Sequence, residues 1–369
     1  MYKLTYLLAL LILASVVYAQ PMNQYTQYLA NPYMVNPAYA GAEEFTHIQA
    51  SYRKQWMGVA GSPGNNYLSA HTRYKKEKKA EDYIERDWKP YKQDNSNYTV
   101  PTRGRTTEIA RQAEQKKIDS IKTGQMQKEL EYRKKIEEFK QSQKYAPHHG
   151  FGANVLNMSA GTFTRNSLYV SYAYHLWIAK KARLAMGGSL GFVQNSVNPV
   201  SGIDNDDQPL NTFNNAKAKM SPDLIIGGLL YSKTYFVGIS GFALLPTNPY
   251  AGINENQKAA ILGLAGYRIN INDDFSVTPS FLVRYAMGNP ISIDVSAKAS
   301  YKMIWLGATY RKTDAVAFMI GANFGPVDVS YSYDMATSVL SKYGSGGHEI
   351  ILGYRLAKKK GTTNSLLFN

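Results

Sequence analysis

The sequence lacks cysteine altogether, although the chain has 369 residues. This absence excludes disulfides, zinc–thiolate sites and a lipid anchor attached to a cysteine. Beyond the N-terminal region, no apolar run reaches the roughly eighteen residues typical of a membrane-spanning helix. The sequence also contains no G-x-S-x-G elbow, no Walker-type loop and no H-E-x-x-H motif. We therefore predict no catalytic residues, no cofactor and no enzymatic activity.

Metal-binding patterns are weak as well. The six histidines are spread along the chain, and the adjacent pair His148 and His149 follows Pro147 in an expected loop. No carboxylate spacing completes a metal site there. The acidic loop at residues 204–207 loosely resembles a calcium loop but lacks the distal glutamate of an EF-hand. The sequence therefore predicts no metal site.

The N-terminus carries the pattern of an export signal. Lys3 forms a short positive region, and residues 4–17 form an apolar stretch that is shorter than a membrane-spanning helix. Residues 17–19 then offer the small-residue spacing that signal peptidase recognises. We predict a signal peptide over residues 1–19, a mature chain that begins at Gln20, and a protein that leaves the cytoplasm.

The next segment, residues 20–45, contains two Asn-Pro pairs, Asn31-Pro32 and Asn36-Pro37. Because proline fixes its own φ and biases the preceding residue away from helix, we expect a stiff, turned ribbon. A disordered N-terminus is the alternative. Disordered tails are seldom so aromatic, and this segment has enough apolar surface to pack against a larger structure. Its four tyrosines are Tyr25, Tyr28, Tyr33 and Tyr39.

Two regions, residues 46–72 and 150–357, show repeated period-two alternation of apolar and polar residues, as at residues 291–300. The 29 tyrosines and 29 glycines suit a membrane barrel, with aromatic girdles expected near strand ends. Charged residues within the strands fall mostly on the polar face. The girdle residues we expect are Tyr174, Trp177, Tyr235, Tyr285, Trp305 and Tyr354, and the charged residues are Arg284, Asp294, Lys298, Asp328, Asp334 and Arg355. The predicted fold is all-β, an outer-membrane antiparallel β-barrel of about 14 strands.

Residues 73–149 interrupt this pattern with a charged insertion. Residues 106–145 read as a helix that Pro147 ends. The insertion accounts for much of the formal charge of +15, so nucleic acid is not an expected partner. Two interpretations remain open, a solvated charged helix or a docking arm for an acidic partner or lipopolysaccharide. Counting strands from a periplasmic entry places the insertion on the periplasmic side. Residues 358–369 form a C-terminal tail.

Several motifs together resemble the PorP/SprF family of Bacteroidetes outer-membrane proteins. The resemblance spans the mature chain except the insertion, and the N-terminal motif is specific. The residues that carry it are Gln27-Tyr28, Asn31-Pro32, residues 36–41 (NPAYAG), residues 52–56 (YRKQW) with Gly58, Pro63, residues 69–71 (SAH) and residues 348–356 (HEIILGYRL).

The resemblance implies a role in type IX secretion and gliding motility, in which such proteins help exported adhesins reach or stay on the cell surface or tie periplasmic machine parts to the outer membrane. The expected partners are subunits of that machinery, exported adhesins and outer-membrane lipid. We expect residues 31–41 to lie in or under the barrel mouth as a plug, anchored by Arg53 and Trp56. The predicted plug or partner-binding residues are Asn31, Pro32, Asn36, Pro37, Tyr39, Gly41, Arg53, Gln55 and Trp56. A passive porin for small solutes is the main alternative.

Overall fold

A computed structural model of the chain describes residues 25–75, 145–197, 218–247, 258–312, 314–337 and 344–357, with part of residues 112–138. The predicted signal peptide and the C-terminal tail lie outside the described residues. Two compact units are present, residues 76–146 on one hand and the rest of the chain on the other. Within the described residues, no helix has the length and apolarity needed to cross a membrane.

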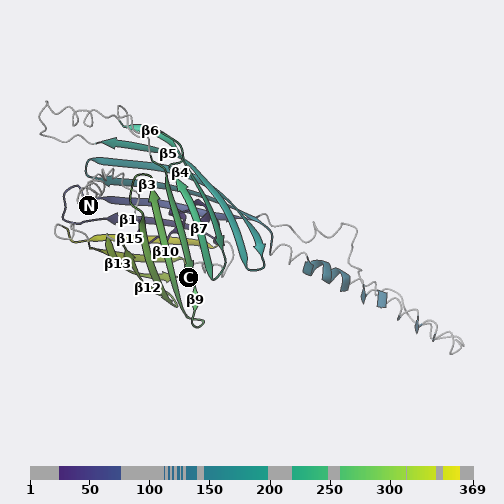
Figure 1. The fold of residues 1–369 in the computed structure, drawn as a ribbon. Coiled ribbons are helices and arrows are strands. Elements are labelled where there is room, and N and C mark those ends of the chain that lie inside the picture. The colour runs from purple at the N-terminus through teal and green to yellow at the C-terminus, as the bar shows by residue number, and fades with distance from the viewer. Residues whose placement is uncertain are drawn as a thin grey trace, which may run out of the picture. The chain divides into compact units, whose positions relative to one another are not determined.

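The larger unit is a closed antiparallel β-barrel (Figure 1). Each strand pairs with its neighbours in sequence, except that β8 and β9 both pair with β10 and not with each other. The first strand pairs with the last, and β10 pairs with β11 to complete the ring. The strands are β1 (Phe45–Lys54), β2 (Gly64–Tyr74), β3 (His148–Ala160), β4 (Phe163–Ala179), β5 (Ala182–Val197), β6 (Lys219–Tyr231), β7 (Tyr235–Phe242), β8 (Ala260–Tyr267), β9 (Ile269–Asn270), β10 (Phe275–Ala286), β11 (Ser292–Tyr301), β12 (Ile304–Arg311), β13 (Ala315–Phe324), β14 (Val327–Ala336) and β15 (Gly347–Ala357).

The barrel has fourteen crossings, as the sequence predicts. The sheet contains fifteen strands, but β8 and β9 both pair with β10 and follow one another along it, so together they form one crossing. The predicted start near Thr46 also holds, since β1 begins one residue earlier. An even number of crossings brings both ends of the barrel chain to the same side.

The alternation along each strand separates a lipid face from a lumenal face. Val170 is 64 % exposed, whereas the adjacent Ser171 is 1 % exposed and points inward. The predicted polar face of β11 is likewise inward, because Asp294 and Lys298 are buried while Val295 is exposed. A barrel in a membrane needs this arrangement, with apolar side chains toward lipid and polar ones toward the lumen.

Trp305 differs from the prediction. We expected it in an outward aromatic girdle, but it is buried and points into the lumen, where Lys298 Nζ lies 4.5 Å from the centre of its ring. Its neighbours in β12, Ile304 and Leu306, are exposed. The inward Trp305 ring fits against the adjacent strand because Gly321 has no side chain. A Cβ at that position would overlap the ring.

The predicted helical insertion is not confirmed. Within residues 76–144 the structure describes one continuous helical run, residues 130–138, and scattered helical residues between 112 and 127. The insertion is also slightly shorter than predicted, because β2 extends to Tyr74 and β3 begins at His148. Strand pairing continues to these ends, with Tyr74 opposite His149, so the two predicted loop histidines belong to β3.

Candidate functional site: a segment inside the barrel

Residues 25–44, here called the lumenal segment, lie inside the barrel. Their hydrogen bonds reach opposite sides of the wall. Asn31 bonds to Ser69 of β2, Tyr33 to Ser171 of β4, and Tyr28 to Ser296 of β11. A segment that contacts strands all around the ring can only occupy the interior. Most of its side chains are buried, and its tyrosines form one hydrophobic cluster with inward wall residues.

Each Asn-Pro pair begins a short 3-10 helix. Asn31 precedes η1 (Pro32–Met34) and Asn36 precedes η2 (Pro37–Tyr39), with proline as the first helical residue in both. Proline suits that position because its φ is already helical and it has no N–H to leave unpaired. The carboxamide oxygen of Asn36 also accepts a hydrogen bond from Ala38 N at 2.9 Å, which caps η2. The pairs therefore produce the turned ribbon expected from the sequence.

Asn36 also binds the wall directly. Its Nδ2 donates to the carbonyl oxygens of Gly228 on β6, at 2.9 Å, and Ile239 on β7, at 3.2 Å. This approach depends on glycine, because a Cβ at Gly227 would overlap Asn36 Oδ1 and one at Gly238 would lie 2.9 Å from Asn36 Nδ2. Asn36 is thus a side chain in contact with the backbones of two strands.

Other glycines extend this close contact across the wall. A Cβ at Gly152 on β3 would lie 2.6 Å from the Tyr33 hydroxyl, and one at Gly187 on β5 would lie 2.8 Å from the Ala38 backbone. Together with Gly150, described below, these positions place glycines at inward sites on β3, β5, β6 and β7. We call them the wall glycines: Gly150, Gly152, Gly187, Gly227 and Gly238.

The C-terminal part of the lumenal segment binds the wall through its backbone carbonyls. His148 Nε2 donates to the Gly41 carbonyl at 3.0 Å, and His175 Nε2 donates to the Ala40 carbonyl at 2.8 Å. The two imidazoles stack with their centres 4.4 Å apart. Gly41 has φ +75°, and a Cβ at Gly150 would overlap the Ala40 carbonyl, so both positions require glycine.

The tyrosines of the segment bring hydroxyl groups to polar wall residues. Tyr28 donates to Ser296 Oγ at 2.9 Å, and the Tyr33 hydroxyl lies 2.7 Å from Ser171 Oγ. Tyr39 is 2 % exposed, and burial, reinforced by the charge of Glu43, raises the pKa of its phenol well above the usual range. The phenol therefore stays neutral, as packing in a protein interior favours.

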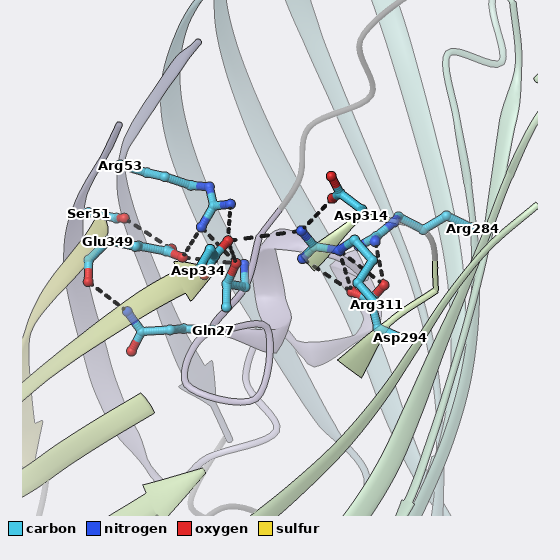
Figure 2. Close-up of polar contacts among 10 residues, drawn as sticks. Gln27, Ser51, Arg53, Arg284, Asp294, Arg311, Asp314, Asp334 and Glu349 are labelled. Carbon is cyan, nitrogen blue, oxygen red and sulfur yellow. Dashed lines mark hydrogen bonds and ion pairs between the residues drawn. The ribbon is translucent and has the colours of Figure 1, made fainter. Parts of the chain in front are cut away.

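The N-terminal end of the segment meets a buried ion network (Figure 2). Arg53 of β1 pairs with Asp334 of β14 at 2.5 Å and with Glu349 of β15 at 3.1 Å, and it donates to Thr26 Oγ1 at 2.7 Å. Thr26 Oγ1 in turn donates to Asp334 at 2.7 Å, and Gln27 Nε2 donates to the Glu349 carbonyl at 3.2 Å. Arg53 is 1 % exposed, so its charge is compensated entirely inside the barrel.

The ion network continues across the lumen to β11 and β10 (Figure 2). Arg311 lies 3.9 Å from Asp334 and 3.2 Å from Asp294, which pairs with Arg284 at 2.7 Å. Asp314 adds a carboxylate 3.0 Å from Arg311. The network joins strands on both sides of the β1–β15 seam and includes the first residues of the lumenal segment.

The structure brings together most of the predicted site residues. Asn31, Pro32, Asn36, Pro37, Tyr39 and Gly41 all belong to the lumenal segment, and Arg53 binds its N-terminal end. Gln55 and Trp56 lie apart from that contact, in the loop between β1 and β2, where the Trp56 backbone has φ 48°.

The sequence analysis missed two groups in the site. Thr26 carries no distinguishing pattern, and its carboxylate partners, Asp334 and Glu349, are more than 300 residues away in sequence. The wall glycines do leave a signal, because an isolated glycine at an inward position of a strand pattern often marks a close approach of another backbone.

The chain is similar to a FadL homologue of Pseudomonas aeruginosa, at 9 % identity and a TM-score of 0.42, over 88 % of this chain and 93 % of that one. It is also similar to the outer-membrane protein Omp33 of Acinetobacter baumannii, at 7 % identity and a TM-score of 0.40, over 86 % and 99 % of the two chains. Among curated proteins, none matches the chain.

A family model gives the more specific result. The model described as type IX secretion system membrane protein PorP/SprF matches residues 17–81 and 117–354. These two ranges include the lumenal segment and nearly all of the barrel. The protein is therefore an outer-membrane β-barrel, and the chain belongs to the PorP/SprF family of type IX secretion system membrane proteins.

Proposed function

We infer that the protein is a non-enzymatic component of the type IX secretion and gliding machinery whose barrel is plugged by its own N-terminal chain. The occupation of the lumen by residues 25–44 is the observation that carries this proposal. In this role the barrel binds other proteins and does not conduct solutes. Its partners are exported surface adhesins, periplasmic parts of the machinery, or both.

The packing of the lumen disfavours the alternative, a passive porin. Two cavities beside the lumenal segment have volumes of about 60 and 120 Å³, which is far less than a water-filled channel of a porin requires. The ion network and the wall glycines fix the segment at both of its ends. A solute would have to displace a segment that is packed and hydrogen-bonded throughout its length.

The connections between strands suggest an orientation. Four short turns, at residues 180–181, 232–234, 302–303 and 325–326, lie at one end of the barrel, and a fifth, at residues 161–162, lies at the other end. In outer-membrane barrels, short turns face the periplasm and long loops face the exterior. Because β2 ends and β3 begins at the short-turn end, the charged insertion at residues 76–146 enters the periplasm. There it is available to bind a periplasmic part of the machinery.

Two measurements test the proposal. Affinity purification of the tagged protein from its own outer membrane is expected to recover secretion-machine subunits or a large surface adhesin. In planar bilayers, the purified barrel is expected to be nearly silent, and removal of residues 20–41 is expected to open a conducting pore. Deletion of the tail at residues 358–369, which is not part of the lumenal segment, serves as the matched control and should stay silent.

Other outcomes would support different functions. Recovery of the barrel alone, together with open-channel currents from the intact protein, would favour a porin. Loss of secretion without a change in conductance after removal of residues 20–41 would show that the segment docks partners but does not close the pore. The shift in gel mobility on heating, which reports a folded barrel, must be retained in every variant.

A further inference from the structure

A small cavity lies beside the ion network, at the end of the barrel opposite the four short turns. Its volume is about 20 Å³. Gln55 and Trp56 line it from the loop after β1, and Asp314 lines it from the connection between β12 and β13. Asp334 and Ala336 line it from β14. The cavity therefore brings the two predicted site residues that lie apart from the Arg53 contact next to carboxylates of the network.

Asp334 offers an acceptor atom to this cavity. The residue is 5 % exposed, and its Oδ2 accepts from Thr26 at 2.7 Å and pairs with Arg53 (Figure 2). Arg311 Nη1 also approaches Oδ2, at 3.9 Å. Among the described residues, Oδ1 of the same carboxylate has no hydrogen-bond partner although it is buried. Because an unsatisfied buried acceptor is costly, this atom favours an added hydrogen-bond donor.

The charge of the ion network favours a donor that is a cation. Four carboxylates face three guanidinium groups, and in the described part of the chain these carboxylates pair with no other cation. At neutral pH the network therefore has one net negative charge, which an added cation would balance. The carboxylates are Asp294, Asp314, Asp334 and Glu349, and the guanidinium groups are Arg53, Arg284 and Arg311.

The size of the cavity favours an ammonium group. A cavity needs at least about 10–15 Å³ to hold one water molecule, so this one accommodates a single group of that size. An ammonium group is compact and has three N–H donors, whereas a guanidinium group is larger and planar. The Asp314 side chain is 30 % exposed, so the cavity is reached from solvent past this residue.

Trp56 is held at the cavity in a conformation that is uncommon for a bulky residue. Its φ of 48° lies in the left-handed region. The next residue, Met57, accepts a hydrogen bond from Ser345 N at 2.9 Å and donates one to the Gly346 carbonyl at 3.0 Å. A Cβ at Gly344 would lie 3.2 Å from Trp56 Cα, so the two loops pack closely. Such conformations cluster at ligand sites, and indole is the preferred aromatic partner of a cation.

We propose that this cavity binds the primary ammonium group of an alkylamine. The nitrogen donates to Asp334 Oδ1, Asp314 balances its charge, and the alkyl stem lies along Trp56. Two sources share this chemistry, the lysine side chain of an exported polypeptide and a free small amine. The site faces the exterior in the orientation proposed above, so the first source rests on the proposed function, whereas binding of the ammonium group does not.

Calorimetry on the purified full-length protein in detergent tests the site. The probes are Nα-acetyl-lysine-N-methylamide, the same compound acetylated on its side-chain nitrogen, and the corresponding arginine compound. We expect the lysine compound to bind about tenfold more tightly than either of the others, because only it has a compact cationic donor.

Methylammonium, which lacks the alkyl stem, distinguishes the two sources of the ligand. Binding about tenfold weaker than that of the lysine compound would support a lysine side chain, because the stem then contributes contact with the rim. Equal affinity would overturn the assignment to a polypeptide and leave a site for a small free amine.

Two variants separate the charge from the cavity. Asp314→Asn is expected to weaken binding of the lysine compound about fivefold. Asp274→Asn, which changes an exposed carboxylate at the opposite end of the barrel, is the matched control and should bind as the parent does. Ala336→Leu fills the cavity from the end of β14 and is expected to abolish binding. The shift in gel mobility on heating reports whether each variant is folded.

Three results would overturn the proposal. Equal affinity for the lysine compound and its acetylated form would show that the cavity does not select a cation. Unchanged binding in a folded Ala336→Leu protein would place the probe elsewhere, and no heat with any probe would mean that the cavity holds only water. These measurements use the purified barrel and report neither conductance nor secretion, so failure of this site is distinguishable from failure of the proposed function.

Discussion

At the scale of single residues, contact between the lumenal segment and the wall depends on glycines, which have no Cβ to keep the two apart. Asn36 reaches the carbonyl oxygens of two strands because Gly227 and Gly238 have no side chain. Larger residues at these positions would separate the segment from the wall. The wall glycines are therefore packing residues, although they contribute no side-chain contact of their own.

Replacing Gly227 by alanine tests this contact. The new Cβ would overlap Asn36 Oδ1, which belongs to a packed segment, so we expect a loss of about 1–3 kcal/mol in the free energy of unfolding. Gly228→Ala is the matched control, because a Cβ there meets no atom within 4 Å. Denaturant unfolding of both variants in lipid or detergent provides the measurement. Equal stability of the two would mean that Asn36 moves aside without cost.

Arg53 is the counter-charge for two buried carboxylates of the site, Asp334 and Glu349. Arg53→Gln would leave Glu349 and Asp334 buried without their main counter-charge, and we expect a loss of about 3–5 kcal/mol in unfolding free energy. Adding Glu349→Gln should recover part of this loss, since one uncompensated charge is then removed. The same denaturant titration measures both variants.

An exposed pair gives the contrast for Arg53. Lys302 lies 3.7 Å from Asp274, and both side chains are more than half exposed. Because solvent screens such pairs, Lys302→Gln should change the unfolding free energy by about 0–1 kcal/mol. If Lys302→Gln and Arg53→Gln lost similar unfolding free energy, the burial of Arg53 would not increase its contribution to stability.

At the scale of strands, the alternation in the sequence was sufficient to predict the barrel, although the predicted helix of the insertion is not confirmed. Alternation at residues 291–300 assigned the lipid and lumenal faces of β11 correctly, because a barrel wall reverses its environment at every residue. Trp305 was misplaced because residue type outweighed position in the prediction. Its exposed neighbours in the same strand already indicate that residue 305 points inward.

The predicted site was less complete than the predicted strands, for a physical reason. Asn-Pro turns are local, so the conformation of residues 31–41 follows from adjacent residues. The partners of that segment are not local. Arg53 and Asp334 are 281 residues apart, and alternation gives the face of each residue but not its neighbours around the ring.

The lipid face of β4 allows a test at this scale. Val170 lies near the middle of this strand and is 64 % exposed, so Val170→Arg would place a charge in the hydrocarbon region. We expect the folded barrel to lose about 2–4 kcal/mol of stability relative to its unfolded state in the same lipid. Val170→Leu keeps the face apolar and should be nearly neutral. Equal stability of the two variants would show that this surface does not contact lipid.

At the scale of the whole molecule, the barrel and its lumenal segment depend on each other. Every inward face carries polar or charged groups, and the segment supplies partners for many of them, from Ser69 on β2 to Ser296 on β11. Without the segment, water would have to solvate these groups. The lumenal segment therefore belongs to the folded core of the barrel, and the ion network joins its first residues to six strands, β1, β10, β11, β12, β14 and β15.

The insertion at residues 76–146 has the opposite relation to the barrel. It clusters as a separate compact unit, and Tyr74 and His149 on either side of it are paired across β2 and β3, so a short turn can connect these strands. We expect a protein in which Asn-Gly replaces residues 75–147 to insert, to fold and to remain non-conducting, because no pairing within the barrel is lost.

If the insertion docks a periplasmic partner, secretion and gliding should fail in cells that produce this variant, and purification should no longer recover that partner. Cells that produce the protein without residues 358–369 provide the control for truncation itself. Normal secretion by the shortened protein would remove the insertion from the docking role, whereas failure of the barrel to fold would contradict the independence of the two units.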